Sequence, residues 1–353
     1  MRELLTELKR LIAGPSPLGR GVVTSVWGSA PQPAGSVMLA TADGRMAGSV
    51  CGGCIEGMVM EEIQAAFVRG TPKLLTYGVT DDEAFSAGLA CGGKIEVLVE
   101  PGVRPELIPL LDRRVGIVLV TVLGGFGGAV LITDDGQEPC ILPAFQGDEV
   151  AEYDTTEELA PFVPAIIKAA EAALAIESSH TAEVVIPTGS LMAFFEVMPR
   201  APRLIVFGAG QIAAEMTPMA KRLGFETIVA DGRETFLSKE RFPEADRLVL
   251  AWPEEAFRQV GIDQRTYICL LSHDPKFDEP ALRIALRSDA RYIGAIGSRK
   301  TQAARRERLL KEGFSESDVA RIHGPIGLPI GGKRPAETAL AVLAEVVKNR
   351  YGG

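Results

Sequence analysis

The chain has 353 residues, which is too long for one ordinary hydrophobic core and predicts two domains. Hydrophobic residues make up 46% and charged residues 24%, so the composition is that of a globular protein and excludes a disordered chain. The formal net charge of -9 excludes wholesale binding of nucleic acid, which needs a basic face to displace counterions.

The first segment, Met1–Ala13, mixes charged and apolar residues at helical spacing, which predicts a helix and not a secretory signal. Five cysteines in a chain large enough to build its own cores favour a reducing compartment, and we expect the protein to be cytoplasmic. The other elements expected before residue 199 are strands at 21–27, 36–41, 71–78, 94–99, 118–123 and 127–132, helices at 55–69, 100–114 and 155–179, and two strands within 184–197.

The stretch Val115–Ile132 carries no charge and is long enough to raise the question of a membrane span. Glycines in its interior and β-branched residues on its flanks favour two buried strands joined by a turn, so no membrane span is expected. When Gly35 is aligned with Gly127, four further pairs match: Leu39 with Leu131, Thr41 with Thr133, Asp43 with Asp135 and Gly44 with Gly136. This match predicts a duplicated strand-loop-strand unit, and a chance likeness between two hairpins is the alternative.

Two Cys-Gly-Gly elements lie between these hairpins. The first runs Cys51-Gly52-Gly53-Cys54-Ile55-Glu56 into a predicted helix, and the second is Cys91-Gly92-Gly93. Unpaired N–H groups at a helix start favour thiolates, and glycines let a bulky ligand come close to the backbone. Three alternatives stay open: small thiols packed under a glycine turn, a thiol-disulfide enzyme using Cys51 and Cys54, and a zinc site that adds Cys91 and a histidine.

The best domain boundary is Pro199-Arg200-Ala201-Pro202. We expect an N-terminal α+β domain with the Cys-Gly-Gly loops at 1–198, a linker at 199–202, and a C-terminal domain at 203–350.

The C-terminal part predicts a Rossmann-like, doubly wound parallel sheet. A buried strand at 204–207 is followed by Gly208-Ala209-Gly210-Gln211-Ile212-Ala213, and a second strand ends at Asp231. This is the Gly-x-Gly-x-x-Ala form of the dinucleotide fingerprint, with an acidic residue placed to contact a ribose. Gly208, Gly210, Ala213 and Asp231 are therefore candidate cofactor-binding residues. Further strands are expected at 248–252, 267–271 and 292–296, and a last helix at 335–349.

Polar residues follow the later strands of this sheet, where the ligand crevice of an open α/β sheet lies. His273 and Asp278 come after the fourth strand, and Ser298 and Arg299 after the fifth. Ser298 and Arg299 are candidates to hold a phosphate at a helix start, with a solvated helix start as the alternative. For His273, a capping or structural hydrogen bond is the alternative to acid–base work.

At this point several motifs occur together in one order, and the sequence resembles the xanthine dehydrogenase accessory family, XdhC/CoxI. The matching segments in the first half are Gly28-Ser29-Ala30-Pro31 with Gly35, Gly48-Ser49-Val50, Gly52-Gly53-Cys54-Ile55-Glu56 and Cys91-Gly92-Gly93. In the second half they include Val206-Phe207-Gly208-Ala209-Gly210, Ser272-His273-Asp274, Gly297-Ser298-Arg299 and Pro325-Ile326-Gly327-Leu328.

The resemblance implies a maturation factor that binds molybdenum cofactor (molybdopterin), supports its sulfuration with a cysteine desulfurase and delivers it to a molybdenum hydroxylase of the xanthine or carbon monoxide dehydrogenase type. Soft thiolates suit such a cargo. On this hypothesis Cys54 and Cys91 face the molybdenum or its sulfur, and Glu56 orients a thiol or a pterin amine. Ser29, Gly52, Gly53, Gly92 and Gly93 shape the pocket. A homodimer is the default expectation.

An NAD(P)-dependent oxidoreductase is the alternative function. It would explain Gly208, Gly210 and Asp231, with NAD(P) or another nucleotide as ligand, but no clear Tyr-x-x-x-Lys motif accompanies them.

Overall fold

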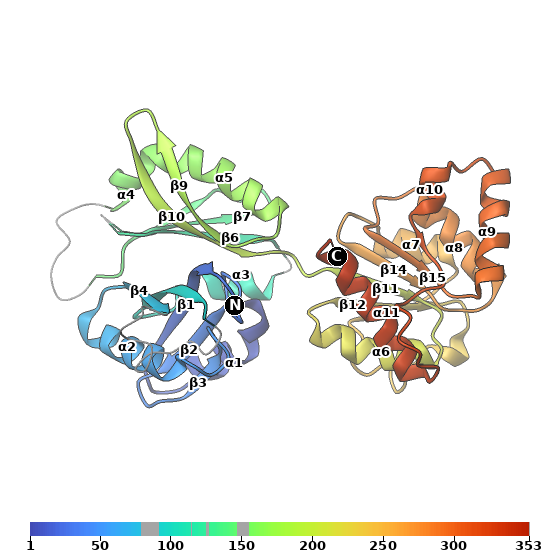
Figure 1. Cartoon of the computed structure of the whole chain (residues 1–353), viewed down its shortest axis with the longest axis horizontal. Coiled ribbons are helices and arrows are strands. Elements are labelled where there is room, and N and C mark those ends of the chain that lie inside the picture. The colour runs from blue at the N-terminus through green and yellow to red at the C-terminus, as the bar shows by residue number, and fades with distance from the viewer. Residues whose placement is uncertain (79–91, 114, 125–126, 147–154, 353) are drawn as a thin grey trace. The chain divides into compact units, whose positions relative to one another are not determined.

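The computed structural model describes residues 1–78, 92–113, 115–124, 127–146 and 155–352, and it divides into two compact units (Figure 1). Unit 1 is Met1–Arg200 and unit 2 is Ala201–Gly353, so the division lies inside the segment expected as linker. Within the described residues no helix is long and apolar enough to cross a membrane.

The first half of unit 1 is a five-stranded antiparallel sheet crossed by one long helix. Its sheet order is β3-β2-β1-β5-β4. The elements are β1 (Leu18–Trp27), β2 (Val37–Thr41), β3 (Met46–Gly48), α2 (Glu56–Arg69), β4 (Lys73–Gly78) and β5 (Lys94–Glu100). The N-terminal segment η1 (Arg2–Leu4) and α1 (Leu5–Ile12) confirms the expected first helix.

The second half of unit 1 repeats this topology. Its order, β8-β7-β6-β10-β9, becomes that of the first sheet when β6 is matched with β1. The elements are β6 (Ile117–Val122), β7 (Ala129–Thr133), β8 (Cys140–Leu142), α4 (Thr155–Leu159), η2 (Ala160–Phe162), α5 (Val163–Ala175), β9 (His180–Ile186) and β10 (Gly189–Met198). The charge-free stretch therefore forms two strands, as predicted.

The hairpin turns carry the same hydrogen bond in both halves. Thr41 Oγ1 donates to Asp43 at 2.5 Å, and Thr133 Oγ1 donates to Asp135 at 2.7 Å. These are the pairs that the sequence alignment matched, so the predicted duplication is confirmed.

The two sheets of unit 1 share one core. A central cluster combines Leu39 and Leu98 of the first sheet with Leu119 and Phe194 of the second, and α1 and α3 (Leu107–Asp112) close its side. The outer face of the first sheet packs on α2, and that of the second packs on α4 and α5. Unit 1 is thus a helix-sheet-sheet-helix sandwich.

A buried ion cluster joins the two sheets. Arg20 of β1 donates to Glu100 of β5 at 2.5 Å and to Glu196 of β10 at 2.8 Å, and all three side chains are at most 1% exposed. Arg20 lies opposite Leu39 and Glu100, as Leu119 lies opposite Leu131 and Glu196. The equivalent position is thus an arginine in the first sheet and a leucine in the second, so the guanidinium of Arg20 pairs with both Glu100 and Glu196.

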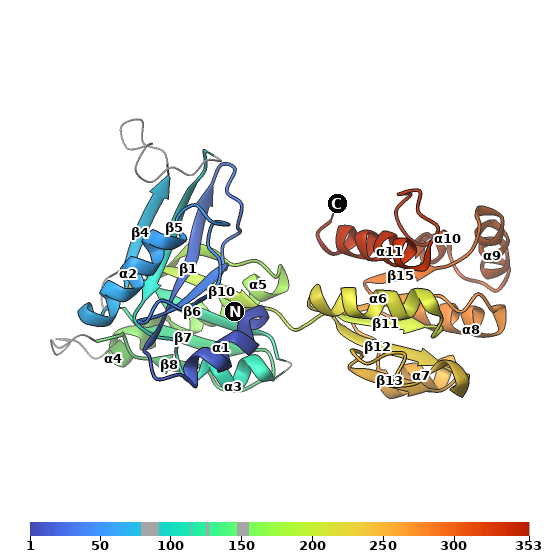
Figure 2. The same cartoon turned by 90° about the horizontal axis from the view of Figure 1, so that it is seen from below.

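Unit 2 is a six-stranded parallel sheet in the order β13-β12-β11-β14-β15-β16, which confirms the predicted doubly wound fold. Its strands are β11 (Arg203–Phe207), β12 (Glu226–Asp231), β13 (Arg247–Leu250), β14 (Thr266–Leu270), β15 (Tyr292–Ala295) and β16 (Ile322–His323). The helices α6 (Gln211–Arg222) and α11 (Pro335–Arg350) cover one face. The other face carries α7 (Pro253–Val260), α8 (Pro275–Leu286), α9 (Arg299–Lys311) and α10 (Glu316–Ala320), with η3 (Glu234–Phe236) in the loop after β12 (Figure 2).

Several predicted boundaries were wrong. The helix expected at 100–114 is only α3, because Glu100 belongs to β5 and prolines at 101 and 105 delay the helix start. The strand expected at 248–252 ends at Leu250, since Trp252 caps α7. The two strands expected within 184–197 extend further, over 180–186 and 189–198, and β8 was not predicted.

Candidate functional site

The first Cys-Gly-Gly loop is built around the carboxylate of Glu56, the first residue of α2. Glu56 Oε1 accepts hydrogen bonds from the backbone N–H groups of Cys51 (3.0 Å) and Gly52 (2.9 Å). Oε2 accepts from Gly53 (2.8 Å) and Ile55 (3.3 Å). The Ser49 hydroxyl donates to Oε1 at 2.5 Å and accepts from the Gly52 N–H. One side chain therefore fixes the whole loop from 49 to 55.

The same contacts hold Glu56 ionised. Burial raises the pKa of the Glu56 carboxyl, but hydrogen bonds from Ser49, Cys51 and Gly52 outweigh it and lower the pKa to about 2. The sequence predicted unpaired N–H groups here that would stabilise thiolates. In the fold the carboxylate accepts from the N–H groups of four loop residues, so these four are not available to a thiolate, and the thiolate itself stays a prediction. Direct contact of Glu56 with a thiol or a pterin amine stays a prediction.

The two thiols of this loop lie in different environments. Cys51 is 1% exposed and packs with Val59 and Ile63 of α2, whereas Cys54 is exposed. Gly52 and Gly53 have φ values of +89° and +116°, and a Cβ on either would meet no described residue within 4 Å. The loop therefore presents Cys54 beside an open backbone surface.

The second Cys-Gly-Gly element is described only in part, because Cys91 lies outside the described residues. Gly93 lies against Ser29, the other residue expected to shape the pocket here: a Cβ on Gly93 would come within 3.0 Å of the Ser29 carbonyl oxygen and the Ala30 nitrogen. Gly92 has a φ of +69°, and no atom of the described residues lies within 4 Å of where its Cβ would be. Ala30 in turn packs against the core cluster that contains Cys51. The structure thus brings Ser29 and Gly93 together and connects them through Ala30 to the core under the first loop.

The segment of the second half that corresponds to the first Cys-Gly-Gly loop has no cysteine, and the described residues contain no metal-binding cluster. Residues 143–154, which follow β8 as the Cys loop follows β3, contain no cysteine in the sequence. Among the described residues, no three His, Cys, Asp or Glu side chains are grouped so that they could hold a metal ion. The zinc alternative therefore has no support from the described part of the chain.

The glycine fingerprint of unit 2 has its expected backbone. Gly208 has a φ of +108°, and a Cβ there would lie 2.5 Å from the Ser272 nitrogen, so glycine is required where β11 and β14 end side by side. Gly210 caps α6, and a Cβ there would meet nothing within 4 Å among the residues that the structure describes. Ala213 is fully buried against the sheet, which gives it a packing role.

Asp231 ends β12 as predicted, but it is paired. Arg233 donates from Nε to Oδ1 and from Nη2 to Oδ2, each at 2.9 Å, and the Ala209 N–H donates to Oδ2 at 2.8 Å. Burial raises the pKa of Asp231, but the bonds from Arg233 and Ala209 outweigh it and keep the pKa below its usual value. The sequence prediction missed Arg233, although its place two residues after Asp231 was a usable signal.

His273 and Asp278 belong to one turn after β14. Ser272 Oγ donates to Asp278 at 2.6 Å and accepts from the Asp274 N–H at 3.1 Å, and His273 between them has a φ of +59°. Burial raises the pKa of the Asp278 carboxyl. His273 is exposed in this turn, and its neighbour Ser272 lies against Gly208.

Ser298 and Arg299 open α9. The Ser298 hydroxyl accepts from the Thr301 N–H at 3.1 Å, so it caps the helix, and Arg299 is exposed. This geometry fits the solvated helix start and leaves phosphate binding as a prediction.

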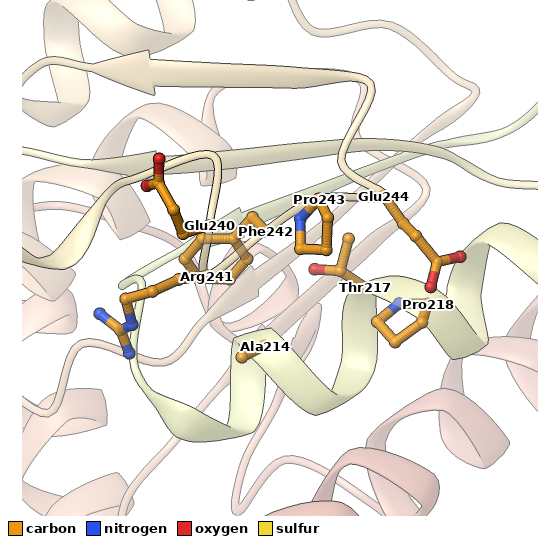
Figure 3. Close-up of a pocket in the computed structure, with 8 residues that line it drawn as sticks. All are labelled: Ala214, Thr217, Pro218, Glu240, Arg241, Phe242, Pro243 and Glu244. Atoms are coloured by element: carbon orange, nitrogen blue, oxygen red, sulfur yellow. The ribbon is translucent and has the colours of Figure 1, made fainter.

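Unit 2 also contains a pocket of about 270 Å³, between α6 and residues 240–244 (Figure 3). Ala214, Thr217 and Pro218 of α6 form one side, and residues 240–244 form the other, with the Arg241 side chain pointing away from Thr217. None of the candidate site residues predicted from the sequence lines it.

Two family models match the chain. The model described as the XdhC and CoxI family matches residues 12–78, which include the loop held by Glu56. The model described as the XdhC Rossmann domain matches residues 204–346, nearly all of unit 2.

Individual relatives agree with these models. The chain is 26% identical over 334 residues to a Bacillus subtilis (strain 168) protein named as a probable xanthine dehydrogenase subunit, covering 93% of this chain and 92% of that protein. It is 25% identical over 337 residues to the molybdenum cofactor insertion chaperone PaoD of Escherichia coli (strain K12), covering 94% and 84%.

A solved structure shares the fold. A crystal structure titled as a xanthine dehydrogenase from Bacillus halodurans matches 99% of this chain and 96% of its own with a TM-score of 0.74 and 24% identity. At that identity the match shows the fold alone.

Proposed function

Because the chain belongs to the XdhC and CoxI family, we propose that it is a chaperone that binds molybdenum cofactor and inserts it into a xanthine dehydrogenase-type molybdenum hydroxylase. The observation that carries this proposal is the loop from Ser49 to Ile55, in which Glu56 holds the backbone and Cys54 is exposed. A relative over nearly the whole chain bears the name of such a chaperone.

The residues of this loop fit the cargo by shape and by chemistry. The cofactor is bulky, and no described side chain or backbone covers the positions of Gly52 and Gly53, so a large ligand can approach the backbone there. A thiol is a soft ligand that suits molybdenum and its terminal sulfur. We assign Cys54, together with Cys91, to hold the metal or its sulfur, and Ser29 with Gly92 and Gly93 to the pocket wall.

The finer steps belong to the same proposal. Sulfuration of the cargo would be supported by a cysteine desulfurase as partner, and a carbon monoxide dehydrogenase-type enzyme is the other candidate recipient. A homodimer is the expected assembly, which light scattering of the purified protein checks. The second unit would hold NAD(P) or another nucleotide, or the nucleotide-like end of the cargo.

The test is binding of cofactor released anaerobically from a molybdenum hydroxylase. Molybdenum measured by elemental analysis and pterin measured by the fluorescence of its oxidised form should both reach one per chain. Cys91→Ala should lose most of both. If wild-type protein retains neither, and NAD(P)H is instead oxidised with candidate substrates, the oxidoreductase alternative replaces the chaperone.

A further inference from the structure

The ends of β12 and β13 gather cationic and aromatic side chains around Asp231. Arg233 and Phe236 come from the loop after β12, Trp252 follows β13, and Phe277 comes from α8. Residue 232 is glycine, and a Cβ there would lie 2.8 Å from Phe277 and 3.6 Å from Trp252, so the chain passes directly against both rings. We call these four side chains the Arg233 cluster.

The carboxylate that would contact a free ribose is already saturated. Oδ1 of Asp231 accepts from the N–H and Nε of Arg233, and Oδ2 accepts from Nη2 of Arg233 and from the Ala209 N–H. With a side chain 1% exposed, Asp231 has little room for a further donor. Its charge is also balanced by the guanidinium, so it repels an incoming anion weakly.

Arg233 presents the charge that remains accessible. Its side chain is 34% exposed, and its guanidinium lies 4.2 Å from the Phe236 ring and 5.2 Å from the Phe277 ring. Arg241 lies on the same ring, 5.7 Å from the centre of Phe236. Two cations therefore flank Phe236, at the strand end where a Rossmann-type sheet receives the ribose.

Trp252 offers a flat surface beside this charge. It stacks on Phe277 at 4.4 Å with an interplanar angle of 19°, and it is still 54% exposed. One face of the indole is therefore covered and held by Phe277, while exposed indole surface is available to a planar base.

We propose that the Arg233 cluster binds a nucleotide whose ribose carries a phosphate, with the phosphate at Arg233 and the base stacked on Trp252. In Rossmann-type sheets an arginine at this strand end accommodates a ribose phosphate, where a free carboxylate would accept from the hydroxyl. NADP⁺, with a 2′-phosphate, and coenzyme A, with a 3′-phosphate, share this chemistry. The inference concerns unit 2 alone and stands whether or not unit 1 binds molybdenum cofactor.

The fluorescence of Trp252 can report nucleotide binding directly. Trp27 and Trp252 are its two tryptophans, so the full-length Trp27→Phe variant leaves Trp252 as the single source of indole fluorescence. We expect NADP⁺ and 2′,5′-ADP, or coenzyme A and 3′,5′-ADP, to quench this fluorescence. Binding should be about tenfold or more tighter than for NAD⁺ and AMP, as one charge-assisted contact provides. Which pair binds identifies the source of the phosphate.

Substitutions of Arg233 test whether this residue causes the preference for a phosphorylated ribose. Arg233→Gln should reduce the preference for a phosphorylated ribose to less than about threefold, while Arg233→Lys retains most of it. Arg247→Gln is the control, since Arg247 is an exposed arginine at the opposite end of β13. Equal affinity for NADP⁺, coenzyme A and NAD⁺ in the wild-type protein would overturn the proposal, as would no binding of any of them. Both results stand even if an Arg233 variant does not fold.

Discussion

The carboxylate of Glu56 accepts the backbone N–H of Gly53 at 2.8 Å, so the first residue of α2 holds the middle of the loop that precedes it. The strand β3 ends at Gly48 and the helix begins at Glu56, and the residues between them have no other regular structure. A glycine loop of this kind would have many conformations without such a contact. The position of Cys54 thus depends on Glu56.

Glu56→Gln tests that dependence. The amide has a single acceptor oxygen, so at least one backbone N–H of the loop loses its partner, and the free energy of unfolding should fall by about 1–3 kcal/mol. Urea denaturation at neutral pH measures the change. Glu61→Gln, at an exposed position of the same helix, is the matched control and should change stability by less than about 0.5 kcal/mol. Equal effects of the two substitutions would show that the Glu56 contacts do not hold the loop.

The stabilisation by Glu56 should depend on pH in a defined direction. The folded-state pKa of about 2 is below the ordinary value of 4.5, so the contribution is complete above pH 4.5 and is lost as the pH falls toward 2. The stability difference between the wild-type protein and Glu56→Gln should therefore be constant near neutrality and shrink through this window. A difference that grows on acidification would have the wrong sign for an ionised, hydrogen-bonded carboxylate.

Thiol labelling tests which cysteines the fold exposes. Cys54 and Cys140 are exposed, whereas Cys269 is fully buried in β14, and burial raises the pKa of its thiol. Iodoacetamide followed by peptide mapping should modify Cys54 and Cys140 in the native protein, and Cys269 only after unfolding. Modification of native Cys269 at the rate of Cys54 would contradict the fold of unit 2.

The cluster around Arg20 predicts a large loss of stability. Arg20→Leu introduces leucine, which is the residue at the equivalent position of the second sheet, Leu119. The substitution leaves Glu100 and Glu196 buried without their cation. Removing one partner of a buried ion pair costs about 3–5 kcal/mol, which thermal or urea unfolding measures. Adding Glu100→Gln and Glu196→Gln should recover a large part of the loss. A single variant as stable as the wild-type protein would show that the cluster contributes little.

The sequence predicted best where one local pattern decides the structure. In unit 2, each buried strand followed by a polar turn, as at Phe207 and Gly208, indicated a strand of the parallel sheet, and all but the two-residue β16 were expected. The duplication in unit 1 was readable because the Thr-x-Asp-Gly turn occurs twice, and the turn chemistry is the same in both copies.

The sequence alone could not indicate which of several nearby groups a side chain pairs with in the fold. Glu56 was expected to orient a thiol or a pterin amine, and in the fold its carboxylate accepts from the Ser49 hydroxyl and from N–H groups of its own loop, which the sequence did not indicate. Asp231 was expected to accept from a ribose, but Arg233 is close enough to pair with it. Short elements such as β8 escape prediction because three residues are too few to show a period.

The most direct test of the proposed function compares two exposed cysteines of unit 1. Cys54→Ser and Cys140→Ser each remove one accessible thiol, but only Cys54 lies in the loop held by Glu56. After anaerobic incubation with released molybdenum cofactor, we expect Cys140→Ser to retain molybdenum and pterin as the wild-type protein does, and Cys54→Ser to retain much less of both. Equal retention by the two variants, with their folds intact by circular dichroism, would contradict it.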